Sequence, residues 1–401
     1  MNLFSQPKPE PHATGILPSQ VIRTLIDTGK IISSEPISDS QIQPASIDLR
    51  LGKIAYQVRA SFLPGESTIE SKIRELLIRE ISLENSAVFE PGSVFLVPLI
   101  ERLALPADVY GKANPKSTTG RLDIFTRLIT EPGQEFDIVP PKHTGQLYLE
   151  IVSRTFAVVI RAGMKLNQLR FIRGKSDVSD NKLSRIAETE RLVYEDDDNP
   201  LKPQINRGLR VSVDLRGDGS KTVAYKAKNN APPIDLAKVG YYSPDDFWEV
   251  IRGPRPNLIL YPRDFYILGS WEKISVPPTY AAEMVPFDPS IGEFRIHYAG
   301  FFDPGFGYGP NSIKGTKAVL EVRAHEVPIL LEDRQLVGKL IYHKMAKEPD
   351  KVYGPAIGSS YQQQGLALSK QFVRQVDAER ESALADSPTL TPSLDFQETA
   401  K

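Results

Sequence analysis

The stretch "LYLEIV", residues 147–152, returns later in the chain as "VLEVR", residues 319–323. Each is a short apolar run with one acid inside it, Glu150 in the first and Glu321 in the second. Apolar runs of this length are typical of buried β-strands. The sequence therefore predicts two related strands, each with a glutamate at the same position.

The segments that precede these strands also match each other. "IERLALPADVYGK" at 100–112 is similar to "SWEKISVPPTYAAE" at 270–283, with Pro106 at the position of Pro277. The prolines share the offset of the two glutamates (277 − 106 = 171 and 321 − 150 = 171). A fixed offset over several segments indicates an internal repeat.

A third pair lies ahead of both, "PASIDLRLG" at 44–52 and "RVSVDLRGDG" at 210–219. Three pairs in the same order predict that the chain holds two copies of one unit. The length agrees, because 401 residues exceed the size at which a single core usually stops growing.

Composition excludes several classes of protein. The formal net charge of −1 lacks the basic excess of a general nucleic-acid binder. The sequence contains no run of about 18 apolar residues, so no membrane-spanning helix is expected. Residues 1–14 lack the basic start and apolar core of a secretory signal. Cysteine is absent, which excludes disulfides and Cys-ligated zinc. We expect a cytoplasmic protein that binds neither membrane nor nucleic acid.

The fold class is predicted to be mainly β, with a few appended helices. Helical spacing of apolar residues is confined to "PSQVIRTLIDTGK", where Ser19 is the expected N-cap and Gly29 the stop, and to "TIESKIRELLIREI" at 68–81. Further apolar runs predict strands of about 5 to 8 residues; these are "SVFLVPLI", "GQLYLEIVS", "NLILYP", "DFYILG" and "KAVLEVRA".

Polar segments divide the chain. The segment between the copies is acidic and contains prolines, which predicts a solvated connector, and the end is rich in Ser, Thr and Pro, which predicts disorder. The expected parts are a flexible N-terminus (1–14), a first domain (15–175), an acidic linker (176–208), a second domain (209–376) and a disordered tail (377–401).

The first copy contains "NPKSTTGRLD" at 114–123, where hydroxyl residues stand between Lys116 and Arg121. Hydroxyls, backbone N–H groups and fixed cations suit a polyphosphate, whose oxygens accept several hydrogen bonds. The string does not match the Gly-Lys-Ser/Thr ending of a Walker loop. A plain polar turn is the alternative interpretation.

The second copy lacks this string and contains instead "HYAGFFDPGFGYG" at 297–309, a glycine-rich hairpin with aromatic residues and Asp303. The first copy has no such hairpin. Each copy therefore retains a different half of one site, which predicts that the two copies share it.

These segments together resemble the dCTP deaminases of the trimeric dUTPase-like superfamily. The matching stretches run in order over most of the chain: "LPSQVIRTLIDTGKI", "IQPASIDLRLG", "LPADVYGKANPKSTTGRL", "RAGMKLNQLRF", the hairpin, and "VYGPAIGSSYQQQGLALSKQF" at 352–372. The resemblance implies two dUTPase-like β-barrel domains of distorted jelly-roll type. It also implies dCTP as substrate, dUTP and ammonia as products, and a homotrimer of six barrels.

The resemblance assigns roles to the phosphate loop. Ser117 and Arg121 match residues that bind and orient near the reacting base, and Thr118 supplies a second hydroxyl. Lys116 replaces an arginine, which keeps the charge but loses the planar fork. Asp123 replaces a glycine, which predicts a change in the local geometry of the loop.

The hairpin and the strand after it match the family in the second copy. Ala299 would offer its main chain to the base, and Asp303 would accept the sugar 3′-hydroxyl. Val319, Leu320 and Glu321 match the strand that holds the catalytic glutamate. Glu150 has the same repeat position and is a possible second site.

The C-terminal segment resembles the lid of the family. Tyr353, Gln363 and Gln364 match lid positions that contact substrate, whereas Ser360 stands where a lysine for the triphosphate is usual. Weaker phosphate binding follows, unless another cation such as Lys370 compensates.

Without cysteine, the zinc site of the common cytidine deaminases cannot form, so no protein-bound metal is expected. A carboxylate must then transfer the protons, and Glu321 is the expected group, with Ser117 and the Ala299 carbonyl placing the water. Mg²⁺ is expected only with the triphosphate.

Two alternatives remain open. One is a dUTP diphosphatase, or an enzyme that performs both reactions. The other is a non-catalytic nucleotide-binding regulator, suggested by the departures at Lys116, Asp123 and Ser360.

Overall fold

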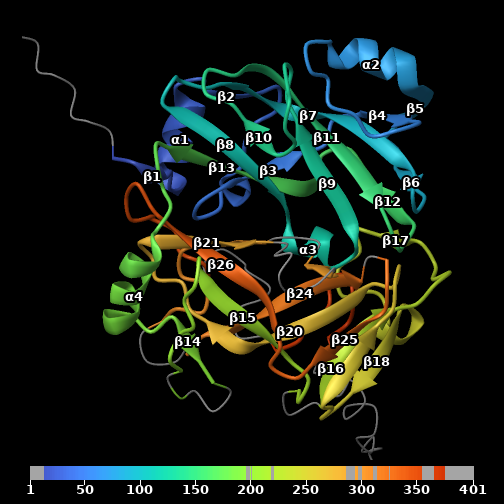
Figure 1. Ribbon diagram of the computed structural model, residues 1–401. Coiled ribbons are helices and arrows are strands. Elements are labelled where there is room, and N and C mark those ends of the chain that lie inside the picture. Colours follow the sequence, from blue (N-terminus) through green and yellow to red (C-terminus); the bar gives the residue numbers. More distant parts are fainter. Residues whose placement is uncertain are drawn as a thin grey trace, which may run out of the picture.

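A computed structural model confirms the mainly β class, and it contains four α-helices among the residues it describes. Those residues are 13–195, 199, 201–217, 221–285, 300–309, 314–324, 326–354 and 365–374, and the backbone of 294–296. The two copies form two halves, stacked one above the other in Figure 1, with the short helix α3 where they meet.

The first half consists of curled antiparallel sheets. One sheet has the order β1-β13-β8-β10, with β3 also on β13, and the other has the order β5-β4-β7-β11-β9, with β2 on β7. The strands are β1 (Gly15–Ile16), β2 (Ile31–Ser33), β3 (Ile47–Arg50), β4 (Ile54–Val58), β5 (Leu77–Ser82), β6 (Ala87–Phe89), β7 (Val94–Ala104), β8 (Val109–Pro115), β9 (Ile124–Ile129), β10 (Ile138–Val139), β11 (Thr144–Ser153), β12 (Val158–Ile160) and β13 (Lys165–Arg173).

The second half is built mainly on one large sheet that contains the order β18-β16-β20-β15-β26-β21-β23, with β24 pairing to β20. Its strands are β14 (Val193–Tyr194), β15 (Leu209–Asp214), β16 (Thr222–Ala227), β17 (Ile234–Asp235), β18 (Trp248–Arg252), β19 (Asn257–Leu260), β20 (Tyr266–Ile274), β21 (Tyr280–Val285), β22 (Phe294–Ile296), β23 (Phe301–Phe302), β24 (Thr316–Ala324), β25 (Ile329–Glu332) and β26 (Leu336–Lys344).

The two halves pair their central strands in the same register. In the first half Glu150 on β11 lies opposite Leu96 on β7. In the second half Glu321 on β24 lies opposite Ile267 on β20. Both members of the second pair follow the first at the predicted offset (321 − 150 = 171 and 267 − 96 = 171). The glutamates therefore occupy equivalent places on equivalent ladders.

The helices are α1 (Ser19–Asp27), α2 (Ile69–Leu76), α3 (Ser117–Gly120) and α4 (Asp180–Thr189). The helix predicted over 68–81 is correct only in its first part, because Leu77–Ser82 form β5 at the edge of a sheet. Pairing of β5 with β4 satisfies those backbone groups of this segment that face β4. Pro18 occupies the N-cap position of α1, so Ser19, the expected N-cap, is the first residue of the helix.

The segment expected to be a solvated linker contains structure. Helix α4 buries Leu183 and Ile186 in the second core, and β14 pairs with β20. The polar composition of the segment hides the helical spacing of its few apolar residues. The expected tail, 377–401, lies outside the described residues.

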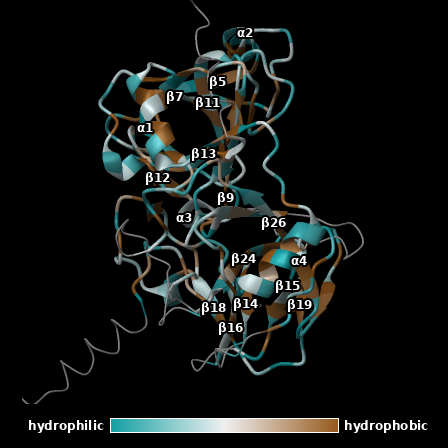
Figure 2. Cartoon of the chain, turned by 90° about the vertical axis from the view of Figure 1, so that its left-hand side faces the viewer, coloured by the Kyte–Doolittle hydropathy of each residue, from teal (hydrophilic) through white to brown (hydrophobic). Residues whose placement is uncertain are grey.

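The halves share a packed junction. The first core includes Phe247, Trp248 and Phe372 from beyond the first half, and β12 pairs in parallel with β17 of the second half. Residues 365–374, here called the C-terminal arm, contact this core through Phe372. In the view turned by 90°, α3 and β9 lie at the level where the halves meet (Figure 2).

Ion pairs across the junction include Arg161 with Asp235 and Lys112 with Glu283. The nitrogen–oxygen distances are 2.5 Å for the first pair and 2.7 Å for the second. Within the described part of the chain, no helix has the length and apolar character needed to cross a membrane.

Candidate active site

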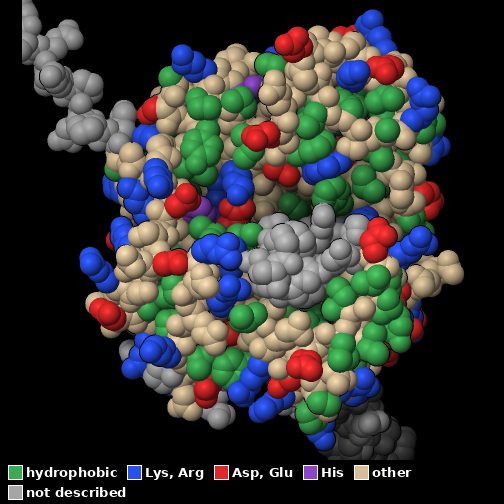
Figure 3. Space-filling view, in the orientation of Figure 1, with side chains coloured by type: hydrophobic (Ala, Val, Ile, Leu, Met, Phe, Trp, Pro, Cys, Tyr) green, Lys and Arg blue, Asp and Glu red, His purple; other side chains and the backbone are tan. Residues whose placement is uncertain are grey.

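A cavity of ≈ 70 Å³ lies where the two halves meet. Figure 3 shows a small hollow near the middle of one face, where charged side chains of both signs gather. The cavity is lined by residues of the phosphate loop, the hairpin, strand β24 and the C-terminal segment: Pro115, Lys116, Ser117, Arg121, Met284, Gly300, Phe301, Phe302, Phe306, Lys317, Ala318, Val319, Glu321, Tyr353 and Gly365. The structure therefore brings both retained half-sites together within one chain.

Strand β24 places Glu321 in the cavity by simple alternation. Lys317, Val319 and Glu321 all line it, because every second side chain of a strand points to the same face. Leu320 points the other way and is fully buried in the second core. Its predicted contact with substrate is therefore not made by its side chain.

Glu321 is an acid held in an apolar setting. Its side chain is buried, and this burial raises the pKa of the carboxyl group to about 8, while the nearby charge of Arg121 opposes the rise. A carboxyl group that gains and loses a proton near neutral pH can accept a proton from water and return it to a base. Strongly shifted acids in clefts are typical of catalytic sites.

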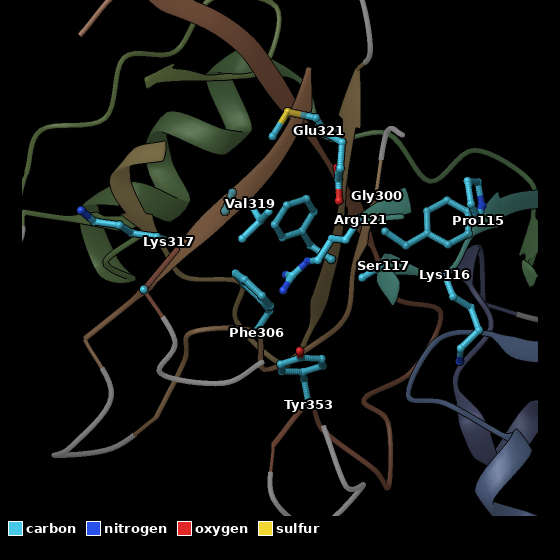
Figure 4. A pocket seen from close by; sticks show the side chains of 15 residues that line it. Pro115, Lys116, Ser117, Arg121, Gly300, Phe306, Lys317, Val319, Glu321 and Tyr353 are labelled. Carbon is cyan, nitrogen blue, oxygen red and sulfur yellow. The ribbon is translucent and has the colours of Figure 1, made fainter. Parts of the chain in front are cut away.

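Arg121 reaches Glu321 from the other half of the molecule. It follows α3 directly, where its backbone N–H donates to the Ser117 carbonyl at 3.1 Å. Its guanidinium donates to the carbonyl of Ala367 at 3.0 Å, so the C-terminal arm helps to hold it. Figure 4 shows the Glu321 carboxyl end and the Arg121 side chain directed into the same space, with Tyr353 below them.

Aromatic residues form one wall of the cavity. Phe302 and Phe306 are in edge-to-face contact with ring centroids 4.9 Å apart, and Tyr353 packs on Phe306 at 5.3 Å. Flat apolar walls of this kind suit a planar base. The hairpin supplies Phe302 and Phe306 to this wall, and the C-terminal segment supplies Tyr353.

Lys116 and Thr118 face a second hollow beside the first. The Lys116 amino group lies 2.5 Å from Asp48 and points away from Glu321 (Figure 4). This hollow measures ≈ 370 Å³, and its polar lining includes Lys165 and Lys370. Burial and the charge of Lys116 lower the pKa of Lys370, which places these cations close together.

Asp303 lies next to the cavity without being part of its lining. Its carboxylate accepts a hydrogen bond from Arg170 at 2.9 Å, and the same guanidinium donates to the carbonyls of Ala282 and Phe302 at 3.0 Å. Burial raises the pKa of Asp303, and the charge of Arg170 opposes this. A first-half arginine thus fixes the hairpin on which Asp303 stands.

Glu150, the possible second acid, is placed differently. Arg127 donates to one of its carboxylate oxygens from Nε at 2.9 Å and from Nη2 at 2.5 Å. Glu150 does not line either hollow at the junction. Glu150 therefore pairs with an arginine, whereas Glu321 lines a cavity.

Sequence reasoning missed Lys317 and Met284, which also line the cavity. The Lys317 amino group lies 2.7 Å from the Asp214 carboxylate, and both side chains are buried. Alternation along β24 could have revealed Lys317, since it is four residues before Glu321. Met284 has no comparable signal in the sequence.

Ala299, Gln363 and Gln364 lie outside the described residues. Their neighbours Gly300 and Gly365 line the cavity. No group of three His, Asp or Glu side chains that could hold a metal ion occurs among the described residues.

Comparison with known proteins places the chain in a family. The model of the N-terminal domain of 2′-deoxycytidine 5′-triphosphate deaminase matches residues 13–175, and that of the C-terminal domain matches residues 179–372. A crystal structure of 2′-deoxycytidine 5′-triphosphate deaminase from Agrobacterium tumefaciens is 48% identical, with a TM-score of 0.79. It covers 83% of this chain, and this chain covers 99% of it.

Two curated relatives are each about as long as one half. A dCTP deaminase of Natronomonas pharaonis is 32% identical over 168 residues, which are 40% of this chain and 82% of that protein. A "dCTP deaminase, dUMP-forming" of Coprothermobacter proteolyticus is 30% identical over 160 residues, 39% of this chain and 81% of that protein. Since the domain models together match nearly the whole described chain, the chain belongs to the dCTP deaminase family.

Proposed function

We propose that the protein converts dCTP and water to dUTP and ammonia, with Glu321 as the group that transfers protons. One observation supports this most directly. A buried glutamate with a pKa of about 8 faces Arg121 of the other half in an aromatic-walled cavity. Deamination of cytosine needs such a group, because water must lose a proton and the ring nitrogen must gain one.

The proposed sequence of steps is as follows. The Glu321 carboxylate accepts a proton from water as the oxygen bonds to C4 of cytosine, and the proton passes to N3. A second proton from the attacking oxygen goes through Glu321 to the amino group, and the C4–N bond breaks to release ammonia. Ser117, which also lines the cavity, would hydrogen-bond the water, and Arg121 would stabilise the carboxylate form of Glu321. The role of the Ala299 carbonyl remains a prediction.

We propose that the phosphate chain extends past Lys116 into the second hollow. Lys116 lines both hollows, and Thr118, Lys165 and Lys370 line the second. Among the described residues of that lining, Asp48 is the one acid, and Lys116 already pairs with it. Lys165 and Lys370 would thus supply the charge that Ser360 cannot.

This lining does not fit a protein-held Mg²⁺ ion, because cations outnumber carboxylates in it. Mg²⁺ prefers oxygen ligands and commonly arrives on phosphates. We propose that it binds to the triphosphate oxygens only. Activity lost in chelator should return with MgCl₂ alone, and a requirement for zinc would overturn the carboxylate mechanism.

The lysines can be tested separately from the chemistry. Lys165→Met and Lys370→Met should each raise KM for dCTP about tenfold, the effect of one lost interaction of about 1.4 kcal/mol, with little change in kcat. Lys182→Met on the exposed face of α4 is the matched control and should change neither. Unchanged KM in the first two variants would exclude the second hollow as the phosphate site.

A second candidate is a dUMP-forming enzyme, since a relative with that name is about as similar as one without it. Incubation with dCTP and MgCl₂ separates the possibilities. We expect dUTP and ammonia as products. dUMP with pyrophosphate would indicate that both reactions occur, and binding without turnover would indicate a regulator.

We also propose that the chain acts in the cytoplasm and assembles as a trimer of six barrels, as the family resemblance implies. Because residues of both half-sites line one cavity of one chain, we expect a single chain to be active without this assembly. Light scattering of the purified protein gives the oligomeric state, and a monomer with full activity would disprove the trimer without affecting the proposed reaction.

A further inference from the structure

A buried ion pair joins the loop that holds Arg121 to the strand that holds Glu321. Asp123 lies two residues after Arg121, and Arg323 lies two residues after Glu321. The Nη2 atom of Arg323 contacts Oδ2 of Asp123, and its Nε lies 3.2 Å from Oδ1. The Asp123 side chain is fully buried and that of Arg323 is 6% exposed. At the reacting position, Arg121 of the first half faces Glu321 of the second half. Two residues further along each segment, the first half supplies the acid, Asp123, and the second half supplies the cation, Arg323.

The remaining hydrogen bonds of this pair close a network. The Thr155 hydroxyl donates to Oδ2 of Asp123 at 2.5 Å and accepts from Nη2 of Arg323 at 2.7 Å. Nη1 of Arg323 donates to the carbonyl of Arg263, and its guanidinium lies 5.7 Å from the Phe265 ring centre. A buried network with satisfied members favours one arrangement of the groups that it joins.

The backbone of Asp123 has a conformation that glycine adopts most easily. Its φ is 57°, in the left-handed region, where aspartate is tolerated better than most residues at some cost in strain. Its N–H donates to the Gly120 carbonyl at 2.9 Å, and its carbonyl accepts from Arg154 at 3.0 Å. A glycine at this position would leave the buried network without its acid.

We infer that Asp123 and Arg323 form a latch between the halves that positions Arg121 against Glu321. Neither latch residue lines the cavity, so both act through their neighbours. Leu122, between Arg121 and Asp123, is buried in the first core, so a fixed Asp123 also fixes the turn that aims Arg121. This inference rests on the proposed deamination.

The test uses Asp123→Gly, Arg323→Met and the double variant. Glycine suits the backbone of position 123, and methionine keeps much of the arginine stem, so both proteins should fold. We expect kcat for dCTP to fall about 100-fold in each, as displacement of a reacting group by about 1 Å can cause, while KM changes less than about threefold. The double variant should be no worse than either single one, because the pair acts as a unit.

Asp123→Asn should give an intermediate kcat, because the amide tolerates the same backbone and still accepts hydrogen bonds. The matched control is Arg161→Met, which removes another ion pair across the junction, at 2.5 Å from Asp235. Its melting temperature should fall while its kcat stays at the wild-type value. If kcat falls in Arg161→Met as it does in Arg323→Met, or if Asp123→Gly keeps full kcat, the latch is disproved.

A crystal structure of Asp123→Gly separates this inference from the proposed function, because it needs no turnover. In it we expect the Arg121 guanidinium to leave its place at 3.0 Å from the Ala367 carbonyl. An unmoved Arg121 would overturn the latch even if the enzyme deaminates dCTP. A moved Arg121 in a protein whose wild type shows no deamination would leave the latch intact and refute the reaction.

Discussion

Glu321 and Glu150 occupy the same place in two copies of one fold, yet their surroundings differ. Both are buried on a strand that has a neighbour on each side, and both pair with equivalent neighbouring strands. Glu150 faces Arg127 on the adjacent strand β9, directly opposite in the register. Glu321 faces a cavity and an arginine that comes from the other half. The neighbours of an acid therefore decide whether it is a structural ion or a group that exchanges protons.

Arg127, the partner of Glu150, is itself held by further contacts. Arg127 donates to the Ser61 hydroxyl and lies over the Phe136 ring at 3.7 Å from its centre. These contacts fix the guanidinium against Glu150, which lines neither hollow at the junction. Glu150 is therefore not proposed as a second active site.

The largest expected effect is the loss of activity on Glu321→Gln. The amide keeps the shape but cannot transfer protons, so kcat should fall at least about 10³-fold, within the range attributed to general acid–base catalysis. Ammonia release measures kcat, and calorimetry should show that dCTP still binds. Glu150→Gln is the matched control with near wild-type kcat. If Glu150→Gln is the inactive variant, the comparison above is reversed.

The second effect is the pH dependence of activity. Burial raises the pKa of Glu321 to about 8, so the carboxylate that accepts the proton is the minor form at lower pH. We expect kcat/KM to rise about tenfold per pH unit from pH 6 towards pH 8 and then to level off. A flat profile over this range would show that Glu321 does not need to lose its proton.

The same shift affects stability. Between pH 4.5, the ordinary pKa, and about 8, the folded Glu321 binds a proton that the unfolded chain does not. The free energy of unfolding should therefore fall as pH rises, by about 1.4 kcal/mol per unit from this group. Urea unfolding of wild type and Glu321→Gln at several pH values measures how the difference in their free energies of unfolding changes with pH. This pH dependence should vanish if the acid were already ionised in the folded protein.

A smaller effect concerns the two glutamates at pH 8.5. Glu150→Gln leaves the Arg127 charge without its carboxylate and should lower the free energy of unfolding by about 2 kcal/mol. Glu321→Gln removes an acid from an apolar setting and should raise it. Functional groups often lower stability in this way. If both substitutions change the free energy of unfolding in the same direction, as measured by urea unfolding, the distinction between Glu150 as a structural acid and Glu321 as a reactive acid is wrong.

The last prediction concerns whether the site forms within one chain, and here we expect no change in activity. Ser117 and Glu321 line one cavity of one chain, so mixing inactive Ser117→Ala chains with inactive Glu321→Gln chains should restore no activity. Calorimetry should give one nucleotide site per chain. Recovered activity in the mixture, after unfolding and refolding together, would show that the functional site forms between chains.

Much of the architecture follows from patterns that are local in the sequence. The strands around Glu150 and Glu321 and the duplication were predictable, because alternation and repeated segments are visible without the fold. The roles of Ser117, Arg121 and Glu321 followed from the family resemblance instead, and all three line one cavity in the structure. Alternation would also have placed Leu320 in the core rather than at the substrate.

What escaped prediction depends on partners that are distant in the chain. Arg170 approaches Asp303 from 133 residues away, and Arg323 approaches Asp123 from 200 residues away. Asp123 stands where the family has a glycine; its backbone is left-handed, and its carboxylate pairs with Arg323 across the junction. A single sequence contains no signal for such pairings.

The C-terminal arm has a consequence for how the protein is made. Phe372 belongs to the first core, in contact with Phe247 at 5.4 Å and Trp248 at 6.0 Å between ring centres. A ribosome synthesises this aromatic residue after every strand of the second half. The half that emerges first therefore cannot complete its core until the strands of the other half have also been translated.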